Sequence, residues 1–189
     1  GVPFRTTSIN VSARQCTSDG FIRVLNKVLS ESAVPVKELG LEIEITEGLM
    51  LNHVDETVTR LQEVREMGIS LSMDDFGTGY SSLNYLRMFP IDKLKIDRSF
   101  VMNMESEEQD AGIVSAILSM AANLGLQTTA EGVETPGQLA MMQKGGCDYI
   151  QGFLFSKPVP AEEVPQLLRD QPFMTQQGEV DKLEMSAVD

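Results

Sequence analysis

The sequence alternates six times between a short β-rich run and a stretch with helical periodicity. The β-rich runs are Thr6–Ser12, Leu41–Glu47, Ser70–Asp75, Lys93–Asp97, Gln127–Val133 and Tyr149–Phe155. The helical stretches are Phe21–Ser32, His53–Met67, Ser81–Phe89, Gln109–Leu124, Pro136–Lys144 and Ala161–Arg169. Because strands that alternate with helices pair in parallel through right-handed crossovers, this pattern predicts either an open doubly wound sheet or a closed (β/α) barrel.

The length of each unit is that of a barrel unit. One strand and its helix take about 25–30 residues here, and eight such units total about 250 residues, the usual size of a (β/α)8 barrel. The chain of 189 residues supplies about six units. We therefore expect an α/β fold of the TIM-like (β/α)8 type that is incomplete, with the missing units ahead of Gly1. Residues 1–170 would form this domain, and the polar residues 171–189 a flexible C-terminal tail.

Each β-rich run has one polar and one apolar face. In Leu41–Glu47, for example, Glu42 and Glu44 share the face opposite to Ile43. Helices cover both faces of an open doubly wound sheet, so its strands are apolar on both faces, whereas a barrel can place a polar face in its interior. In a barrel the active site lies at the carboxyl ends of the strands. The polar residues at or near these ends are Asn10, Glu44, Asp74, Lys95, Glu131 and Gln151.

Carboxylates gathered in one barrel interior repel one another and need cations or protons. Lys93 and Lys95 offset only part of this charge. A cluster of Asn, Asp and Glu oxygens suits hard divalent ions such as Mg²⁺ or Mn²⁺. Two such ions would hold the attacking water and the leaving oxygen of a phosphodiester.

The composition excludes several other classes of protein. With 15 Lys and Arg against 28 Asp and Glu, the formal charge is −13, which argues against binding of a nucleic acid polymer. Since no run approaches 18 apolar residues and no signal peptide opens the chain, we expect no membrane insertion of this segment. Cys16 and Cys147 fit free thiols in a reducing cytoplasm, either in a free protein or in the cytoplasmic domain of a membrane-anchored parent.

Six strings, in order along the chain, resemble the EAL domain family, the bacterial phosphodiesterases that hydrolyse cyclic di-GMP. The strings are SINVSARQ from Ser8, LEIEITE from Leu41, DDFGTGYSSL from Asp74, KID from Lys95, EGVE from Glu131 and QG from Gln151. The Glu-Ala-Leu signature, whose Glu binds metal in the family, is absent. In the family it precedes the strand that carries Asn10, so we interpret its absence as truncation.

The resemblance implies a modified TIM barrel with two Mg²⁺ or Mn²⁺ ions and the linear product pGpG. The positions that match metal ligands are Asn10, Glu44, Asp74, Asp75 and Glu131. The positions that match catalytic residues are Lys95, which contacts the hydrolytic water and would assist general-base catalysis, Glu131, and Asp97 near that water. Gln151, Glu134 and Asn10 match positions around the substrate. Alternation along the strand would point Asp75 outward, and here we follow the motif.

The resemblance also implies a homodimer and further domains. Glu47 matches the residue that holds the loop of Phe76, Gly77, Thr78 and Gly79, which couples dimerisation to metal binding in the family. We expect the second copy to contact Phe76–Arg87, and sensor, receiver or GGDEF domains to be fused to this one. Two other functions remain open: a non-catalytic cyclic di-GMP receptor, because one ligand is absent, and a metal-dependent lyase that uses Lys95 as its base.

Overall fold

The computed structural model describes residues 6–51, 54–79 and 86–170. Three expected features lie wholly or partly outside the described residues. They are the helix start at His53, most of the helix Ser81–Phe89 and the tail Gln171–Asp189.

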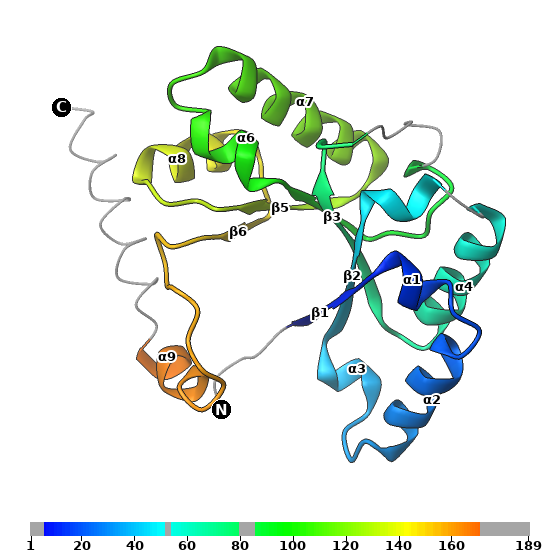
Figure 1. Cartoon of the computed structure of the whole chain (residues 1–189). Helices are drawn as coiled ribbons and strands as arrows, with labels where there is room; N and C mark the ends of the chain where they lie inside the picture. The colour runs from blue at the N-terminus through cyan, green and yellow to red at the C-terminus, as the bar shows by residue number, and fades with distance from the viewer. Residues whose placement is uncertain (1–5, 52–53, 80–85, 171–189) are drawn as a thin grey trace.

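Six parallel strands form one sheet in which each strand lies beside its neighbour in sequence. The strands are β1 (Thr7–Val11), β2 (Leu41–Thr46), β3 (Ser70–Phe76), β4 (Lys93–Ile96), β5 (Gln127–Glu131) and β6 (Tyr149–Gln151). A doubly wound sheet reverses its strand order partway, and this sheet does not. The sheet curls into part of a barrel with helices around its outer face (Figure 1), so the expected incomplete barrel is confirmed.

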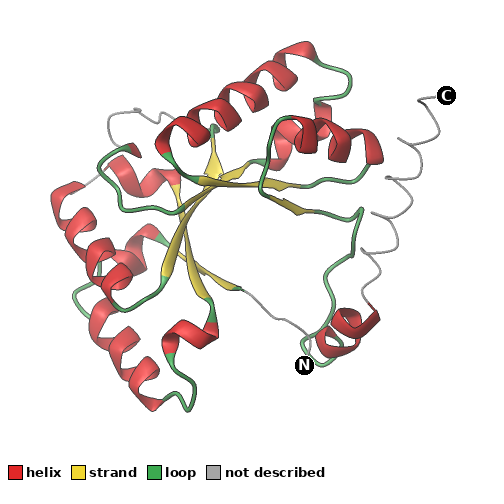
Figure 2. Ribbon diagram, turned by 180° about the vertical axis from the view of Figure 1, so that it is seen from behind, coloured by secondary structure: helices red, strands yellow, loops and turns green. Residues whose placement is uncertain are grey.

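The longer helices each follow a strand along the chain, and all but the C-terminal one cover the convex side of the sheet (Figure 2). They are α2 (Phe21–Glu31), α4 (Val54–Glu66), α7 (Glu108–Leu124), α8 (Pro136–Lys144) and α9 (Val164–Asp170). Four short helices were not predicted, because one turn carries no apolar period. These are α1 (Ala13–Cys16), α3 (Val36–Leu39), α6 (Arg98–Asn103) and the 3₁₀ helix η1 (Glu47–Leu51). Among the described residues, no helix has both the length and the apolar character to cross a bilayer.

The two faces of the sheet carry the expected side chains. Ile45, Leu71, Leu94 and Ile96 are at most 1% exposed and pack in the hydrophobic core. The alternate positions are polar and nevertheless buried: Glu42, Glu44, Ser72, Lys93, Lys95 and Thr129. The strands therefore enclose a polar interior, as the alternation predicts.

Two strands end at least two residues earlier than the sequence indicates. β5 ends at Glu131, where Gly132 takes a φ of +72°, a conformation that glycine adopts readily. β6 ends at Gln151 because the next residue, Gly152, packs against the backbone of Val133. A Cβ on Gly152 would lie 2.0 Å from the Val133 carbonyl oxygen. This close approach sets the end of the sheet beside Glu131.

Two glycines test this account of the backbone. Gly112 lies inside α7 with open space around it, so Gly112→Ala should raise the free energy of unfolding by about 1 kcal/mol. Gly152→Ala forces a methyl group into the Val133 backbone and should lower the free energy of unfolding by about 1–3 kcal/mol. Urea unfolding of both variants measures the difference. Shifts of the same sign would contradict the packing described.

Candidate active site

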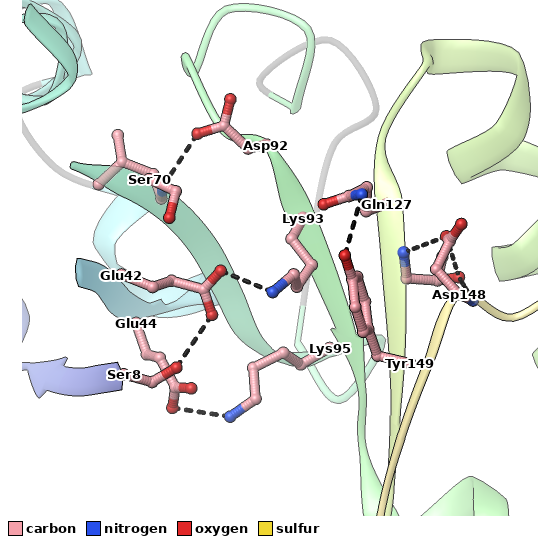
Figure 3. A network of polar contacts seen from close by, with 12 residues as sticks. Ser8, Glu42, Glu44, Ser70, Asp92, Lys93, Lys95, Gln127, Asp148 and Tyr149 are labelled. Carbon is pink, nitrogen blue, oxygen red and sulfur yellow. Dashed lines mark hydrogen bonds and ion pairs between the residues drawn. The ribbon is translucent and has the colours of Figure 1, made fainter. Parts of the chain in front are cut away.

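Lys95 lies at the centre of the polar interior, where it contacts carboxylates from three other strands. Its Nζ is 2.7 Å from Glu44 Oε2 on β2, 3.0 Å from Asp74 Oδ1 on β3 and 2.6 Å from Glu131 Oε1 on β5. Lys95 itself is 5% exposed. Figure 3 shows its side chain reaching across β3 toward Glu44. A buried charge is stable only when it has partners of opposite charge. The contacts of Lys95 therefore bring together three of the predicted site residues, Glu44, Asp74 and Glu131.

Burial and ion pairing shift the pKa values of Lys95 and Glu131 in opposite directions. Burial by itself lowers the pKa of Lys95, but its hydrogen bonds to Glu131, Glu44 and Asp74 outweigh burial and leave the pKa above its ordinary value. Burial raises the pKa of Glu131, and the contact with Lys95 opposes that rise without cancelling it. Lys95 is therefore an ammonium group, and its partner Glu131 binds a proton more readily than an exposed glutamate.

Asp75 joins the cluster through an irregularity of β3. The register between β3 and β4 shifts between Met73 and Phe76, and Asp75 has a φ of +55°, which is rare for a residue other than glycine. The outward orientation that alternation predicts for Asp75 is therefore wrong. Burial and the neighbouring carboxylates of Asp74 and Asp97 raise the pKa of Asp75.

Three carboxylates converge closely enough to hold one cation. One oxygen each of Asp74, Asp75 and Glu131 lies within 4.8 Å of the others. Two ligands on one Mg²⁺ or Ca²⁺ ion, each bonded at about 2.0–2.6 Å, can be separated by about 4–5 Å. The donors are all oxygen, as hard divalent ions require. The residues present therefore fit a divalent metal site.

The other predicted residues surround this cluster. Asn10, which is exposed, is level with Glu44 in the β1–β2 register. Asp97 follows β4 and caps α6, accepting a hydrogen bond of 2.9 Å from the Ser99 backbone N–H. Its carboxylate also contacts that of Asp75. The structure thus places Asp97 beside the cluster and Asn10 on the neighbouring strand.

Glu47 contacts the loop that follows β3. Its Oε2 accepts a hydrogen bond of 3.1 Å from the backbone N–H of Gly77. A Cβ on Gly79 would lie 2.5 Å from Glu47 Oε1, so the loop and this buried carboxylate fit closely. Phe76 is buried at the end of β3, whereas Thr78 is exposed. Residues 80–85 of the predicted dimer segment Phe76–Arg87 lie outside the described part of the chain.

A cleft of about 440 Å³ opens beside Glu131. The predicted substrate positions Glu134 and Gln151 line it, together with Arg98, Phe153 and Lys157. Arg98 forms an ion pair of 3.0 Å with Glu134. Guanidinium and ammonium groups bind phosphates, and an aromatic ring can stack on a base.

Arg98, Phe153 and Lys157 line the cleft but were not predicted from the sequence as site residues. Arg98 directly follows the KID string, and Phe153 and Lys157 follow the last predicted motif. These positions next to motifs are a signal that could have indicated them. For Phe153 a second signal is the alternation within the run Tyr149–Phe155, which places it on the same face as Gln151.

The chain matches known proteins over most of its length. Residues 1–158 match the family model described as EAL domain. The cyclic di-GMP phosphodiesterase NbdA of Pseudomonas aeruginosa is 50% identical over 129 residues, which cover 68% of this chain and 16% of that protein. The chain thus spans about a sixth of the length of this relative.

Two solved structures share the fold. The PaMucR phosphodiesterase in complex with c-di-GMP has a TM-score of 0.78 and 38% identity, covering 83% of this chain and 63% of that one. The EAL domain of Mycobacterium smegmatis DcpA has a TM-score of 0.80 and 40% identity, with coverage of 87% and 73%. From its sequence match and its barrel alike, the chain belongs to the EAL domain family.

Proposed function

We propose that the domain containing this chain is a metal-dependent phosphodiesterase that hydrolyses cyclic di-GMP to linear pGpG. The observation that carries the proposal is the contact of Lys95 with Glu44, Asp74 and Glu131, which come from three different strands. The name of NbdA and the ligand in the PaMucR structure support the choice of substrate. Residues 1–170 would be the part of the domain that this chain supplies, followed by a tail, with sensor, receiver or GGDEF domains elsewhere in the protein.

In this proposal the carboxylates hold cations and Lys95 orients the nucleophile. Two Mg²⁺ or Mn²⁺ ions would stabilise charge on the attacking and leaving oxygens. Their ligands would be Asn10, Glu44, Asp74, Asp75 and Glu131. Lys95, as an ammonium, would donate a hydrogen bond to the attacking water, with Asp97 close by.

The cleft beside Glu131 provides room for the nucleotide. Gln151 and Glu134 offer amide and carboxylate groups toward it, and Arg98 supplies a positive charge. A phosphate beside Arg98 would face the carboxylate cluster through Glu131, which lines the same cleft. The reaction adds water across one phosphodiester bond, so that the ring opens to a phosphate monoester and a free hydroxyl.

Removal of Lys95 tests the catalytic proposal. Lys95→Ala should lower the rate of pGpG formation by about 100-fold or more, the loss typical of a group that acts on the reacting atoms. The assay follows nucleotide products in Mg²⁺ or Mn²⁺ with the full-length protein that contains this chain. Lys144→Ala, at the exposed end of α8, is the matched control.

The wild-type protein decides between the candidate functions. Failure to form pGpG with either metal would reject the phosphodiesterase. Tight binding of cyclic di-GMP without turnover would instead favour the receptor. A rearranged acid from another substrate, with no pGpG, would favour the lyase.

The raised pKa values of Asp75 and Glu131 predict how the affinity for metal depends on pH. Carboxylates bind cations in the deprotonated form, and these two take up protons at a higher pH than exposed carboxylates. As the pH is lowered, the affinity for Mn²⁺ should therefore start to fall at a higher pH than it would for carboxylates with ordinary pKa values of about 4. Calorimetric titrations at a series of pH values measure this. An affinity that stays constant down to about pH 4.5 would contradict the expectation.

We also propose that Glu47 couples the loop after β3 to a homodimer formed through Phe76–Arg87. Glu47→Gln weakens a charged hydrogen bond to the Gly77 N–H, so exchange of that amide with solvent should accelerate by about tenfold. Hydrogen exchange resolved at Gly77 measures the change. Glu63→Gln, on the exposed face of α4, should leave Gly77 unaffected, and equal exchange in both variants would contradict the coupling.

A further inference from the structure

A second polar layer lies in the barrel interior, next to the cluster formed by Lys95 with Glu44, Asp74 and Glu131. Lys93 Nζ is 2.7 Å from Glu42 Oε2, and the Ser8 hydroxyl donates a hydrogen bond of 3.0 Å to Glu42 Oε1. The Lys93 ammonium also lies 4.7 Å from the centre of the Tyr149 ring. Figure 3 shows Lys93 and Lys95 extending from β4 toward the two glutamates of β2. We call Ser8, Glu42, Lys93 and Tyr149 the lower layer.

The strand register offers Lys93 a second carboxylate. Lys93 is level with Ser72 on β3, and Ser72 is level with Glu44 on β2. Ser72 is fully buried and short, so lysine side chains of β4 can cross over β3 to reach β2. The strand register would pair Lys93 with Glu44. Lys93 instead forms an ion pair with Glu42, which lies two residues earlier on the same face of β2.

The choice of partner matters because both lysines and both glutamates are buried. Exposed fractions are 9% for Lys93, 4% for Glu42 and 7% for Glu44. A buried ammonium without a carboxylate is strongly unfavourable. If Glu42 carried no charge, Glu44 would be the carboxylate at the level of Lys93. Glu44 would then pair with both lysines. One of the two positive charges would lack a negative partner and would face the carboxylates of Asp74, Asp75 and Glu131.

We infer that Glu42 is a positioning residue, which holds Lys93 in the lower layer and so leaves Glu44 to Lys95 and to a bound divalent cation. Ser8 and Tyr149 assist by fixing Glu42 and Lys93 from β1 and β6. This inference rests on the proposed metal site. It concerns the binding of the cation and does not require that Glu42 touch the substrate.

The test is the affinity for Mn²⁺, measured by calorimetry without nucleotide on the full-length protein that contains this chain. Glu42→Gln removes the carboxylate partner of Lys93, which should then pair with Glu44. Mn²⁺ binding should weaken by about tenfold or more, because a unit positive charge then acts on the cation at short range. The double variant Glu42→Gln with Lys93→Met removes both charges and should bind Mn²⁺ within about twofold of wild type. Glu63→Gln on exposed α4 controls for the loss of one negative charge.

A structural measurement accompanies the titration. In a crystal structure of the Glu42→Gln variant, Lys93 Nζ should lie within hydrogen-bond distance of the Glu44 carboxylate. The inference is overturned if Lys93 stays at position 42, if Glu42→Gln binds Mn²⁺ as wild type does, or if the double variant is as weak as the single one. A purely structural role would lower the unfolding temperature without the recovery in the double variant.

A variant that keeps an ion pair between positions 42 and 93 allows the inference to be tested even if Glu42→Gln does not fold. If Glu42→Gln is unfolded, the exchanged pair Glu42→Lys with Lys93→Glu retains both charges but places the ammonium on β2, two residues from Glu44. It should also weaken Mn²⁺ binding, and wild-type affinity would overturn the inference. None of these titrations needs turnover, so a wild-type protein that binds Mn²⁺ but forms no pGpG would reject the proposed function alone.

Discussion

The site depends on the enclosure of charged side chains within a curled parallel sheet. Glu44, Asp74 and Glu131 reach into one interior from three strands and converge on Lys95. In water these carboxylates would be solvated separately, but inside the barrel they are stable only through shared cations. One lysine cannot balance three carboxylates and the adjacent Asp75. The remaining negative charge is what would give this surface its affinity for divalent ions.

The hydrophobic face of the same strands makes this enclosure possible. Apolar residues such as Leu71 and Leu94 pack beneath the outer helices, and burial of their side chains supplies the favourable free energy that offsets the buried charge. Alternation then places polar residues inside at every second position. In the lower layer the charges of Glu42 and Lys93 cancel. Around Lys95, by contrast, the carboxylates outnumber the single ammonium, and negative charge is left over. This contrast separates a charge-balanced ion pair from a cluster of carboxylates that could hold a cation.

The sequence predicts the barrel and most of the site, because both follow from the two-residue period of a strand. Glu44, Asp74, Lys95 and Glu131 all lie where alternation and strand ends place them. Asp75 could not be derived in this way, because its position depends on a register shift and a positive φ. Nor could Arg98 or Lys157, which lie outside the strands and reach the cleft through the path of the chain after β4 and β6. Strand ends set by close backbone contact, as at Gly152, also require the tertiary structure.

In our proposal the carboxylates around Lys95 form a binding site for divalent cations. Its most direct test is the anomalous scattering of Mn²⁺ in crystals of the protein grown with that ion. We expect an anomalous peak within coordination distance of Asp74, Asp75 and Glu131. Ordered Mn²⁺ elsewhere on the protein, with the Lys95 cluster unchanged and without a peak, would contradict it.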